Sequence, residues 1–269
     1  MPACSYSWRV PATVRSARFV AWSNAVLAGE VSPDLAADRI AGSDALHLVD
    51  GLPEGDAQTL PVFLARLSAH AEPAVRLVLP VTGDPAGLPG PGPMAAAALD
   101  AGEGVLLPPR PEGRFGLVPV ESSGAVVWTA YPAAGEVVIT DPPTPTLPSL
   151  AEADRDLAEA LREATELLAA LDVARWDPDS ADVVEALRKG RLDGDGLAPG
   201  YPNRAHEVLA RARRLRAIID LAVRGDGAAV TAGESAARRA ALVPLDRAAR
   251  YAEMAAYNAV LEPRATPRA

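Results

Sequence analysis

The distribution of proline divides this chain of 269 residues into two parts that cannot fold in the same way. Residues 1–149 contain 20 of the 26 prolines, and residues 150–269 contain the other 6. Proline fixes φ and lacks a backbone N–H, so it restricts the first part to short elements and leaves the second free to form long helices. The densest run, Asp141-Pro-Pro-Thr-Pro-Thr-Leu-Pro148, excludes helix and favours an extended, semi-rigid connection.

We therefore predict two domains joined by this run. The boundaries are 1–141 for a mixed domain, 142–148 for the linker, 149–262 for a helical domain and 263–269 for a flexible tail. Charge divides at the same place. The first 149 residues carry 8 arginines against 15 acidic residues, a net charge of −7, and the rest carries 18 basic against 20 acidic residues, a net charge of −2.

The first part shows short helical and strand patterns in turn, which predict an α+β or α/β domain with a small mixed sheet and flanking helices. Ser32-Pro33-Asp34 is a strong helix start, because it offers a capping hydroxyl, a proline in the first turn and an acid near the positive helix end. The last two strands look like a hairpin. The expected helices are 13–28, 33–42, 58–70 and 94–101, and the expected strands are 45–50, 75–81, 105–107, 115–118, 125–131 and 136–140.

The second part contains helical patterns only, which predict an all-α antiparallel bundle. One apolar stripe consists of Leu150, Leu157, Leu161, Ala164, Leu168 and Leu171. Further helices are expected over 177–190, from Asn203 to Arg224, over 231–243 and, after a break at Pro244, over 245–261.

Two of these helices carry opposite charge. Between Ser149 and Arg175 the helix is acidic, and between Asn203 and Arg224 it is basic. On a helical wheel the acids Glu152, Glu159, Glu163 and Glu166 lie opposite the apolar stripe and would face water or a partner. Arg211 and Arg216 instead flank their own stripe, where they would meet Asp154, Asp172 or the acids of another helix.

The composition argues against several classes of function. A net charge of −9 repels phosphate and anionic lipid, so nucleic acid is an unlikely partner. The chain shows neither a membrane span nor a signal peptide, so we expect a cytoplasmic protein. Cys4 is the only cysteine, which excludes an intrachain disulfide and a cysteine-rich zinc site.

No motif in the sequence specifies a reaction. Asp50 and Asp84 follow predicted strands, and if these strands were parallel neighbours the carboxylates could hold a ligand or a metal ion, with His47 nearby. Ordinary turn chemistry also explains both aspartates and is the favoured interpretation. The glycine-rich stretch 83–93 lacks the pattern of a phosphate loop, and Asp193-Gly-Asp-Gly196 lacks the later ligands of a calcium loop. We expect no cofactor and no metal.

Four segments show a resemblance to known sequences. Trp22-Ser-Asn-Ala-Val-Leu27, Leu88-Pro-Gly-Pro-Gly-Pro93, Gly200-Tyr-Pro-Asn-Arg-Ala205 and Tyr257-Asn-Ala259 resemble segments of an uncharacterised protein family of high-GC bacteria. The resemblance extends over most of the chain and implies no particular activity.

Together these features favour a non-catalytic, soluble interaction or regulatory protein, with a protein partner or a second copy of the chain. The alternative is an enzyme, or a domain that binds a small molecule or metal, with a site at the strand ends near Asp50 and Asp84.

Overall fold

A computed structural model describes residues 14–53, 55–69, 75–122, 124–133, 147–170, 196–224 and 232–259 of the chain. These residues form two compact units. The mixed unit contains the described residues up to Leu147, the segment 197–202 and the residues from Tyr257 onward. The helical unit contains the described residues within 148–196 and 203–256.

Two helices open the mixed unit, and the local sequence sets the ends of the second as predicted. α1 spans Arg15–Leu27. α2 spans Pro33–Ala41, and the hydroxyl of Ser32 accepts a hydrogen bond from the backbone N–H of Leu35 at 3.3 Å. Gly42 ends α2 with a φ of 60°, in the left-handed region that favours glycine.

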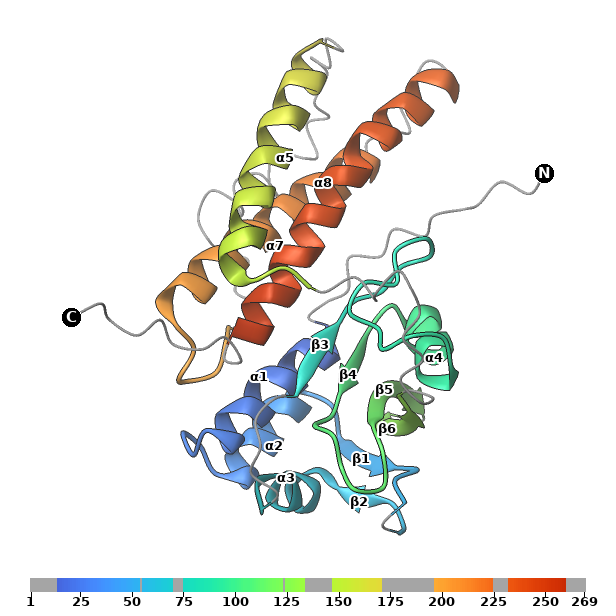
Figure 1. Ribbon diagram of the computed structural model, residues 1–269, viewed down its shortest axis with the longest axis vertical. Helices are drawn as coiled ribbons and strands as arrows, with labels where there is room; N and C mark the ends of the chain where they lie inside the picture. The colour runs from blue at the N-terminus through green and yellow to red at the C-terminus, as the bar shows by residue number, and fades with distance from the viewer. Residues whose placement is uncertain are drawn as a thin grey trace. The chain divides into compact units, whose positions relative to one another are not determined.

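Six strands form one sheet in the order β2-β1-β6-β5-β4-β3 (Figure 1). β1 and β6 are parallel, and every other neighbouring pair is antiparallel, so the sheet is mixed as the sequence predicts. The strands are β1 (Leu46–Asp50), β2 (Gln58–Thr59), β3 (Arg76–Val78), β4 (Gly104–Leu106), β5 (Phe115–Ser122) and β6 (Ala125–Pro132).

Three details of the sheet differ from the sequence prediction. Gln58 and Thr59 pair with β1 as β2, so the helix expected from residue 58, α3, spans only Leu60–Ala69. β3 is an edge strand of three residues, because it ends before Pro80, which cannot donate to a ladder. The hairpin partner of β6 is β5, and the predicted partner 136–140 lies outside the described residues.

One face of the sheet packs against α1 and α3, and α2 packs against these two helices (Figure 1). Trp128 of β6 is fully buried there, with its ring centroid 4.5 Å from that of Phe19 in α1. Phe63 of α3 lies 6.0 Å from Phe19, so the three aromatic rings join two helices to the sheet. Large rings of this kind supply much of the buried area in a chain with only 4% aromatic residues.

The opposite face is covered in part by α4 (Pro93–Ala101). Met94 packs directly over Gly104 of β4 and Gly116 of β5, where a Cβ atom on either glycine would overlap the methionine side chain. Glycine at both positions therefore permits close contact between helix and sheet. The buried cluster beneath α4 consists of Val78, Leu88, Met94, Ala95, Ala98, Val118 and Ala133.

The described part of the helical unit consists of three helices: α5 (Leu150–Ala170), α7 (Asn203–Arg224) and α8 (Ala232–Asn258). Each buries one stripe, with Leu157 in α5, Val208 in α7 and Ala252 in α8 among the buried residues. Leu161 departs from the predicted stripe, since it is 48% exposed. No described helix offers a run of eighteen residues apolar enough to traverse a lipid bilayer.

α8 continues through Pro244, so the break expected at that residue does not occur. A proline inside a helix removes one hydrogen bond and crowds the preceding turn. Leu242 and Leu245, on either side of it, are both buried, so packing on both sides of the proline keeps the two halves in one helix. The helix expected over 177–190 lies outside the described residues.

Candidate functional site

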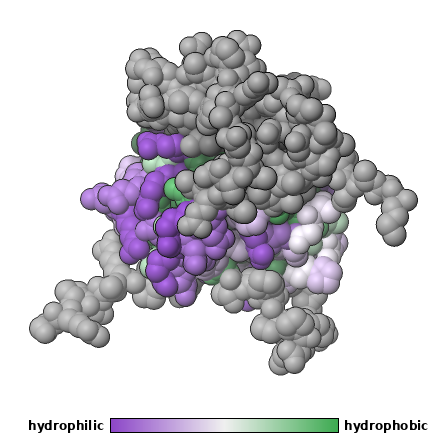
Figure 2. Space-filling view, turned by 90° about the horizontal axis from the view of Figure 1, so that it is seen from above, coloured by the Kyte–Doolittle hydropathy of each residue, from purple (hydrophilic) through white to green (hydrophobic). Residues whose placement is uncertain are grey.

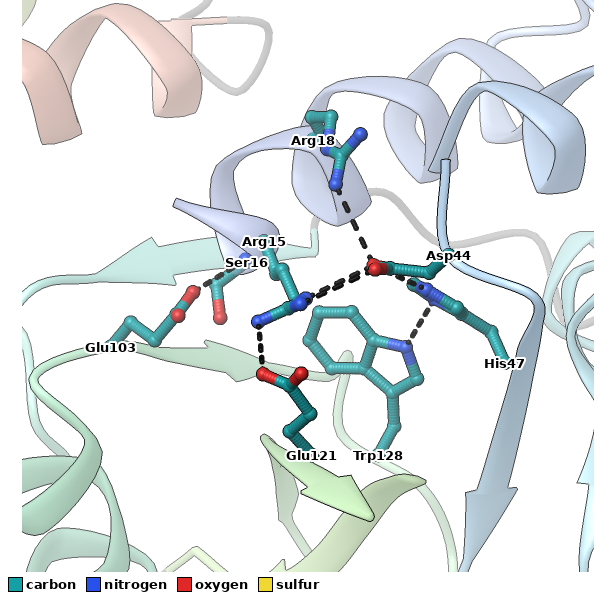
Figure 3. Close-up of polar contacts among 8 residues, drawn as sticks. All are labelled: Arg15, Ser16, Arg18, Asp44, His47, Glu103, Glu121 and Trp128. Carbon is teal, nitrogen blue, oxygen red and sulfur yellow. Dashed lines mark hydrogen bonds and ion pairs between the residues drawn. The ribbon is translucent and has the colours of Figure 1, made fainter. Parts of the chain in front are cut away.

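A polar cluster lies where α1 and β1 begin and β5 ends (Figure 3). The helix contributes two arginines, the sheet contributes a histidine and a tryptophan, and acidic residues from three segments surround them. We name it the Asp44 cluster, after the residue with most contacts. Its members are Arg15, Ser16, Arg18, Asp44, His47, Glu103, Glu121 and Trp128.

Asp44 is the central acceptor. Arg15 donates to both of its carboxylate oxygens, from Nε to Oδ2 at 3.1 Å and from Nη2 to Oδ1 at 3.3 Å. Arg18 Nη2 lies 4.0 Å from Oδ2, and its guanidinium group lies against Gly42. The hydrogen bonds from Arg15 are the main reason that the pKa of Asp44 is lowered, so Asp44 is a carboxylate at neutral pH.

The side chain of His47 is 1% exposed, and both of its ring nitrogens are occupied. Nδ1 lies 3.1 Å from the indole nitrogen of Trp128. Because an indole N–H only donates, Nδ1 must accept and carries no proton. Nε2 lies 3.1 Å from Asp44 Oδ2 and is therefore the donor. Burial lowers the pKa of His47 in spite of the neighbouring carboxylate, so the imidazole is neutral.

Two glutamates hold the first turn of α1. Glu103 Oε2 accepts the backbone N–H of Ser16 at 2.7 Å, one of the first-turn amides that have no acceptor within a helix. Burial raises the pKa of Glu103. Glu121, near the end of β5, lies 3.5 Å from Arg15 Nη1. The start of α1 is thus attached to β5 and to the residue that precedes β4.

The chemistry of the Asp44 cluster is structural. An Asp–His pair can activate a nucleophile when the free nitrogen of the histidine takes up its proton. In this cluster that nitrogen, Nδ1 of His47, already accepts a hydrogen bond from Trp128. An indole is not a nucleophile of that kind, and the ring of His47 is closed to solvent. Among the described residues, no three His, Cys, Asp or Glu side chains gather in a way that could hold a metal ion.

The strands that precede Asp50 and Asp84 are not neighbours, so the geometry on which that predicted site depended is wrong. β6, β5 and β4 lie between β1 and β3, which at about 4.8 Å per strand separates these two strands by about 19 Å. β3 is also antiparallel to β1. Asp50 accepts the backbone N–H of Gly51 at 2.7 Å, and Asp84 closes a backbone turn with Val81, so both serve in turns.

The glycine-rich stretch after β3 lines a pocket together with the start of α4 and the end of β6. This pocket has a volume of about 210 Å³, and no titratable side chain lines it. The residues that line this pocket are Pro89, Gly90, Pro91, Gly92, Pro93, Met94, Ala95, Pro132 and Ala133.

His206 is exposed on α7, whereas His70 and most of the segment 193–196 lie outside the described residues.

Sequence reasoning missed a second group of polar residues, at the outer edge of β3. Asn24 of α1 donates from Nδ2 to the carbonyl of Val75 at 2.9 Å and accepts the N–H of Val75 at 3.1 Å. Asn258 makes the same pair of bonds with Leu77, at 3.1 Å and 2.8 Å. Two carboxamides therefore take the place of a neighbouring strand and satisfy an edge that would otherwise be open.

A tyrosine completes this edge. The hydroxyl of Tyr201 donates to the carbonyl of Tyr257 at 2.7 Å and lies 3.5 Å from Asn24 Nδ2. Burial raises the pKa of Tyr201, which keeps its hydroxyl protonated. Asn24, Tyr201, Tyr257 and Asn258 all belong to the segments that carry the family resemblance. That resemblance was the one signal in the sequence that could have found them.

In the helical unit, the acidic face of α5 has a mixed role. Ser149 and Glu152 form a capping box: the Ser149 N–H donates to the carboxylate at 2.9 Å, and the Glu152 N–H lies 3.3 Å from the hydroxyl. The hydrogen bond from the Ser149 backbone lowers the pKa of Glu152. Glu159 and Glu163 are exposed, and the side chain of Glu166 lies outside the described part.

The two arginines that flank the stripe of α7 pair within the helical unit. Arg211 contacts Asp154 of α5 at 2.5 Å, and Arg204 reaches the same carboxylate at 3.3 Å. Arg216 lies 2.6 Å from Glu253 and 3.7 Å from Asp246, both on α8. Arg216 is only 19% exposed, so its contacts serve packing between helices and leave it little surface for a partner.

Comparisons with known sequences identify relatives but no activity. Family models described as Rv1486c-like protein, N-terminal domain, and Rv1486c-like protein, C-terminal domain, match residues 16–146 and 151–254. Uncharacterized protein Rv1486c and Uncharacterized protein MT1533, from two strains of Mycobacterium tuberculosis, are each 31% identical over 279 residues, 89% of this chain and 94% of theirs. No solved structure matches the chain. The resemblance to an uncharacterised family of high-GC bacteria is thus confirmed.

Proposed function

We propose that this chain, which belongs to the Rv1486c-like protein family, is a non-catalytic protein that acts by binding a basic surface on a protein partner. The observation that carries the proposal is a row of exposed acids along α5, Asp156, Glu159 and Glu163. The buried histidine supports the non-catalytic part, because neither of its nitrogens is available to a substrate.

The members of the acidic row carry the same charge. Its members are three or four residues apart, so their side chains are neighbours on the helix surface. Like charges at this spacing destabilise a helix by about 0.2–0.5 kcal/mol per pair. The buried side of α5, with Leu150, Ala153 and Leu157, faces away from them. A row of like charge is suited to a partner surface of opposite charge.

The chemistry of the row selects the kind of partner. Carboxylates attract arginine and lysine and repel phosphate, which favours a basic protein over nucleic acid or an anionic membrane. Much of the described surface visible in Figure 2 is hydrophilic, with only small apolar areas. We infer that α5, α7 and α8 belong to an antiparallel bundle that presents this row, and that the protein acts in the cytoplasm.

A charge-neutralised variant tests the proposal. Asp156→Asn, Glu159→Gln and Glu163→Gln together remove the row and keep the size of each side chain. The matched control, Asp38→Asn, Asp100→Asn and Glu112→Gln, removes three exposed acids of the mixed unit and changes the net charge equally. The measurement is co-purification from the native host, followed by the affinity for the purified partner at several salt concentrations.

We expect the partner to be lost from the material that co-purifies with the variant. The affinity of the variant for the purified partner should fall at least about tenfold at low salt, a factor that corresponds to about 1.4 kcal/mol. The control should bind as the wild type does. Equal binding by both variants, or the absence of any partner that co-purifies reproducibly with the wild type, would contradict the proposal. Circular dichroism should show that all three proteins keep their helices.

A further inference from the structure

Met94 is an oxidisable side chain that is buried and yet lies beside a pocket. It is 1% exposed and packs against Gly104 of β4 and Gly116 of β5. It also lines the pocket of about 210 Å³ between the glycine-rich stretch, the start of α4 and the end of β6. Because one water molecule takes up about 30 Å³ in the liquid, the pocket has room for a small solute such as hydrogen peroxide.

The first turn of α4 is weakly held. Met94 is the second residue of this helix, after Pro93. Gly92 stands at the N-cap, where it has no side chain to accept a hydrogen bond from a first-turn N–H. A helix end without such a cap opens more easily than the middle of a helix. Brief opening of this turn exposes the thioether of Met94 to the contents of the pocket.

The contact between Met94 and the sheet leaves no room for an added atom. A Cβ atom at Gly116 would lie 2.5 Å from the Met94 sulfur, and one at Gly104 would lie 2.8 Å from its methyl carbon. The other members of the buried cluster, Val78 and Val118 among them, are apolar. A sulfoxide oxygen is polar, and its burial without a hydrogen-bond donor is unfavourable. An oxidised Met94 therefore moves out toward water and takes the start of α4 with it.

We propose that Met94 is an oxidation site and that its sulfoxide releases the start of α4 from the sheet. The oxidant is hydrogen peroxide that enters the pocket. The sulfur attacks one peroxide oxygen, so that an S–O bond forms while the O–O bond breaks. The sulfur loses two electrons to the peroxide, and the leaving hydroxide takes up the proton of the transferred oxygen and becomes water. Methionine sulfoxide reductases reverse such a change, so the release of α4 is reversible.

The chain carries a matched reference residue in Met254. It lies in α8, in the helical unit, and is 0% exposed. The two methionines are therefore almost equally buried, and a difference between their rates of oxidation reports access through the pocket and the helix end. The inference is independent of the proposed function, because it concerns the mixed unit and none of the acids on α5.

Peroxide treatment of the full-length chain tests the site. All proteins carry Cys4→Ser, because Cys4 is the only cysteine and its thiol also reacts with peroxide. Peptide mass spectrometry follows the addition of one oxygen to Met94 and to Met254. We expect Met94 to be oxidised at least about tenfold faster than Met254 in the folded chain, since local opening reaches it first. In concentrated urea the two rates should be equal.

Hydrogen exchange tests the consequence of the oxidation. The amides of α4 should exchange faster in the oxidised chain, and treatment with methionine sulfoxide reductases should restore slow exchange. Met94→Leu, which keeps a similar volume without the sulfur, should retain slow exchange after peroxide treatment. Met254→Leu, the matched control, should respond as the unsubstituted chain does.

Two results would overturn the proposal. The first is oxidation of Met254 as fast as that of Met94 in the folded chain, which would show that the pocket and the helix end give no access. The second is unchanged exchange in α4 after complete oxidation of Met94, which would show that the packed position accepts the sulfoxide. Neither result depends on a substitution at Met94.

Discussion

The indole N–H of Trp128 donates a hydrogen bond to Nδ1 of His47, over 3.1 Å, and thereby fixes a buried histidine in its neutral form. The imidazole of His47 in turn donates from Nε2 to Asp44, and Asp44 also accepts a hydrogen bond from Arg15. One relationship across two parallel strands therefore connects the aromatic core to the polar residues at the start of α1. Four predictions follow from this and from the other polar contacts.

Replacing Trp128 with phenylalanine should change the titration of His47. Without the indole donor, Nδ1 is free to take up a proton, so the pKa of His47 should rise relative to the wild type. The loss of a buried hydrogen bond and of ring volume should lower the free energy of unfolding by about 1–3 kcal/mol. NMR titration of the imidazole and urea unfolding measure the two effects. Trp22→Phe, at a half-buried position on α1, should leave the His47 titration unchanged.

The contribution of His47 to the stability of the protein should fall on acidification below about pH 6.5. Burial lowers the pKa of His47 in the folded state, so the unfolded chain, with a pKa of about 6.5, binds the proton more readily. The contribution of His47 is complete above that value and is lost as the pH falls toward the folded pKa. The pKa of Asp44 is also lowered, but the corresponding loss occurs only below about pH 4.

Urea unfolding of wild type and His47→Asn between about pH 7.5 and pH 5 isolates this effect. The variant should show a smaller loss of stability over that range. Burial raises the pKa values of Glu103 and Asp246, but both residues are present in the two proteins, so their influence cancels in the difference. Identical slopes for wild type and variant would show that His47 does not titrate as its contacts require.

Asn24→Leu should destabilise the protein by about 2–4 kcal/mol, because it leaves the buried N–H and carbonyl of Val75 without partners. Asn258→Leu should cost less, since that side chain is only half-buried. Urea unfolding gives the free energies, and hydrogen exchange at Val75 and Leu77 locates the loss. Exchange that stays slow at Val75 in the Asn24 variant would argue against the edge contact.

Arg216→Met and Arg211→Met should differ in cost although both remove an ion pair. Arg216 is 19% exposed, and its loss leaves Glu253, 5% exposed, with the longer contact to Arg213 at 3.8 Å, so we expect a destabilisation of about 3 kcal/mol. Arg211 is 49% exposed, and its pair with Asp154 should contribute about 0–1 kcal/mol. Equal thermal shifts in the two variants would contradict this assignment of buried and exposed pairs.

Local signals predicted the elements whose ends are set by nearby residues. Ser32, Pro33 and Gly42 gave both ends of α2, because capping depends on a few residues in sequence. Pro244 was misleading for the same reason. Its local preference for a helix break is opposed by the packing of Leu242 and Leu245, and packing cannot be predicted from neighbouring residues in the sequence. The helical wheel placed Arg211 and Arg216 at an edge and offered Asp154 as a partner, which Arg211 contacts, but it could not name Glu253 as the partner of Arg216.

The sequence by itself determined the mixed first part, the long helices of the second and the outward direction of the acids on α5, because spacing and capping act over a few residues. Only the tertiary structure decided the strand order, which separates Asp50 from Asp84 and brings His47 to Trp128. It also brought Asn24, Tyr201 and Asn258 to one strand edge. The physical reason is that hydrogen bonds between distant segments depend on strand pairing and burial, which arise only when the whole core forms.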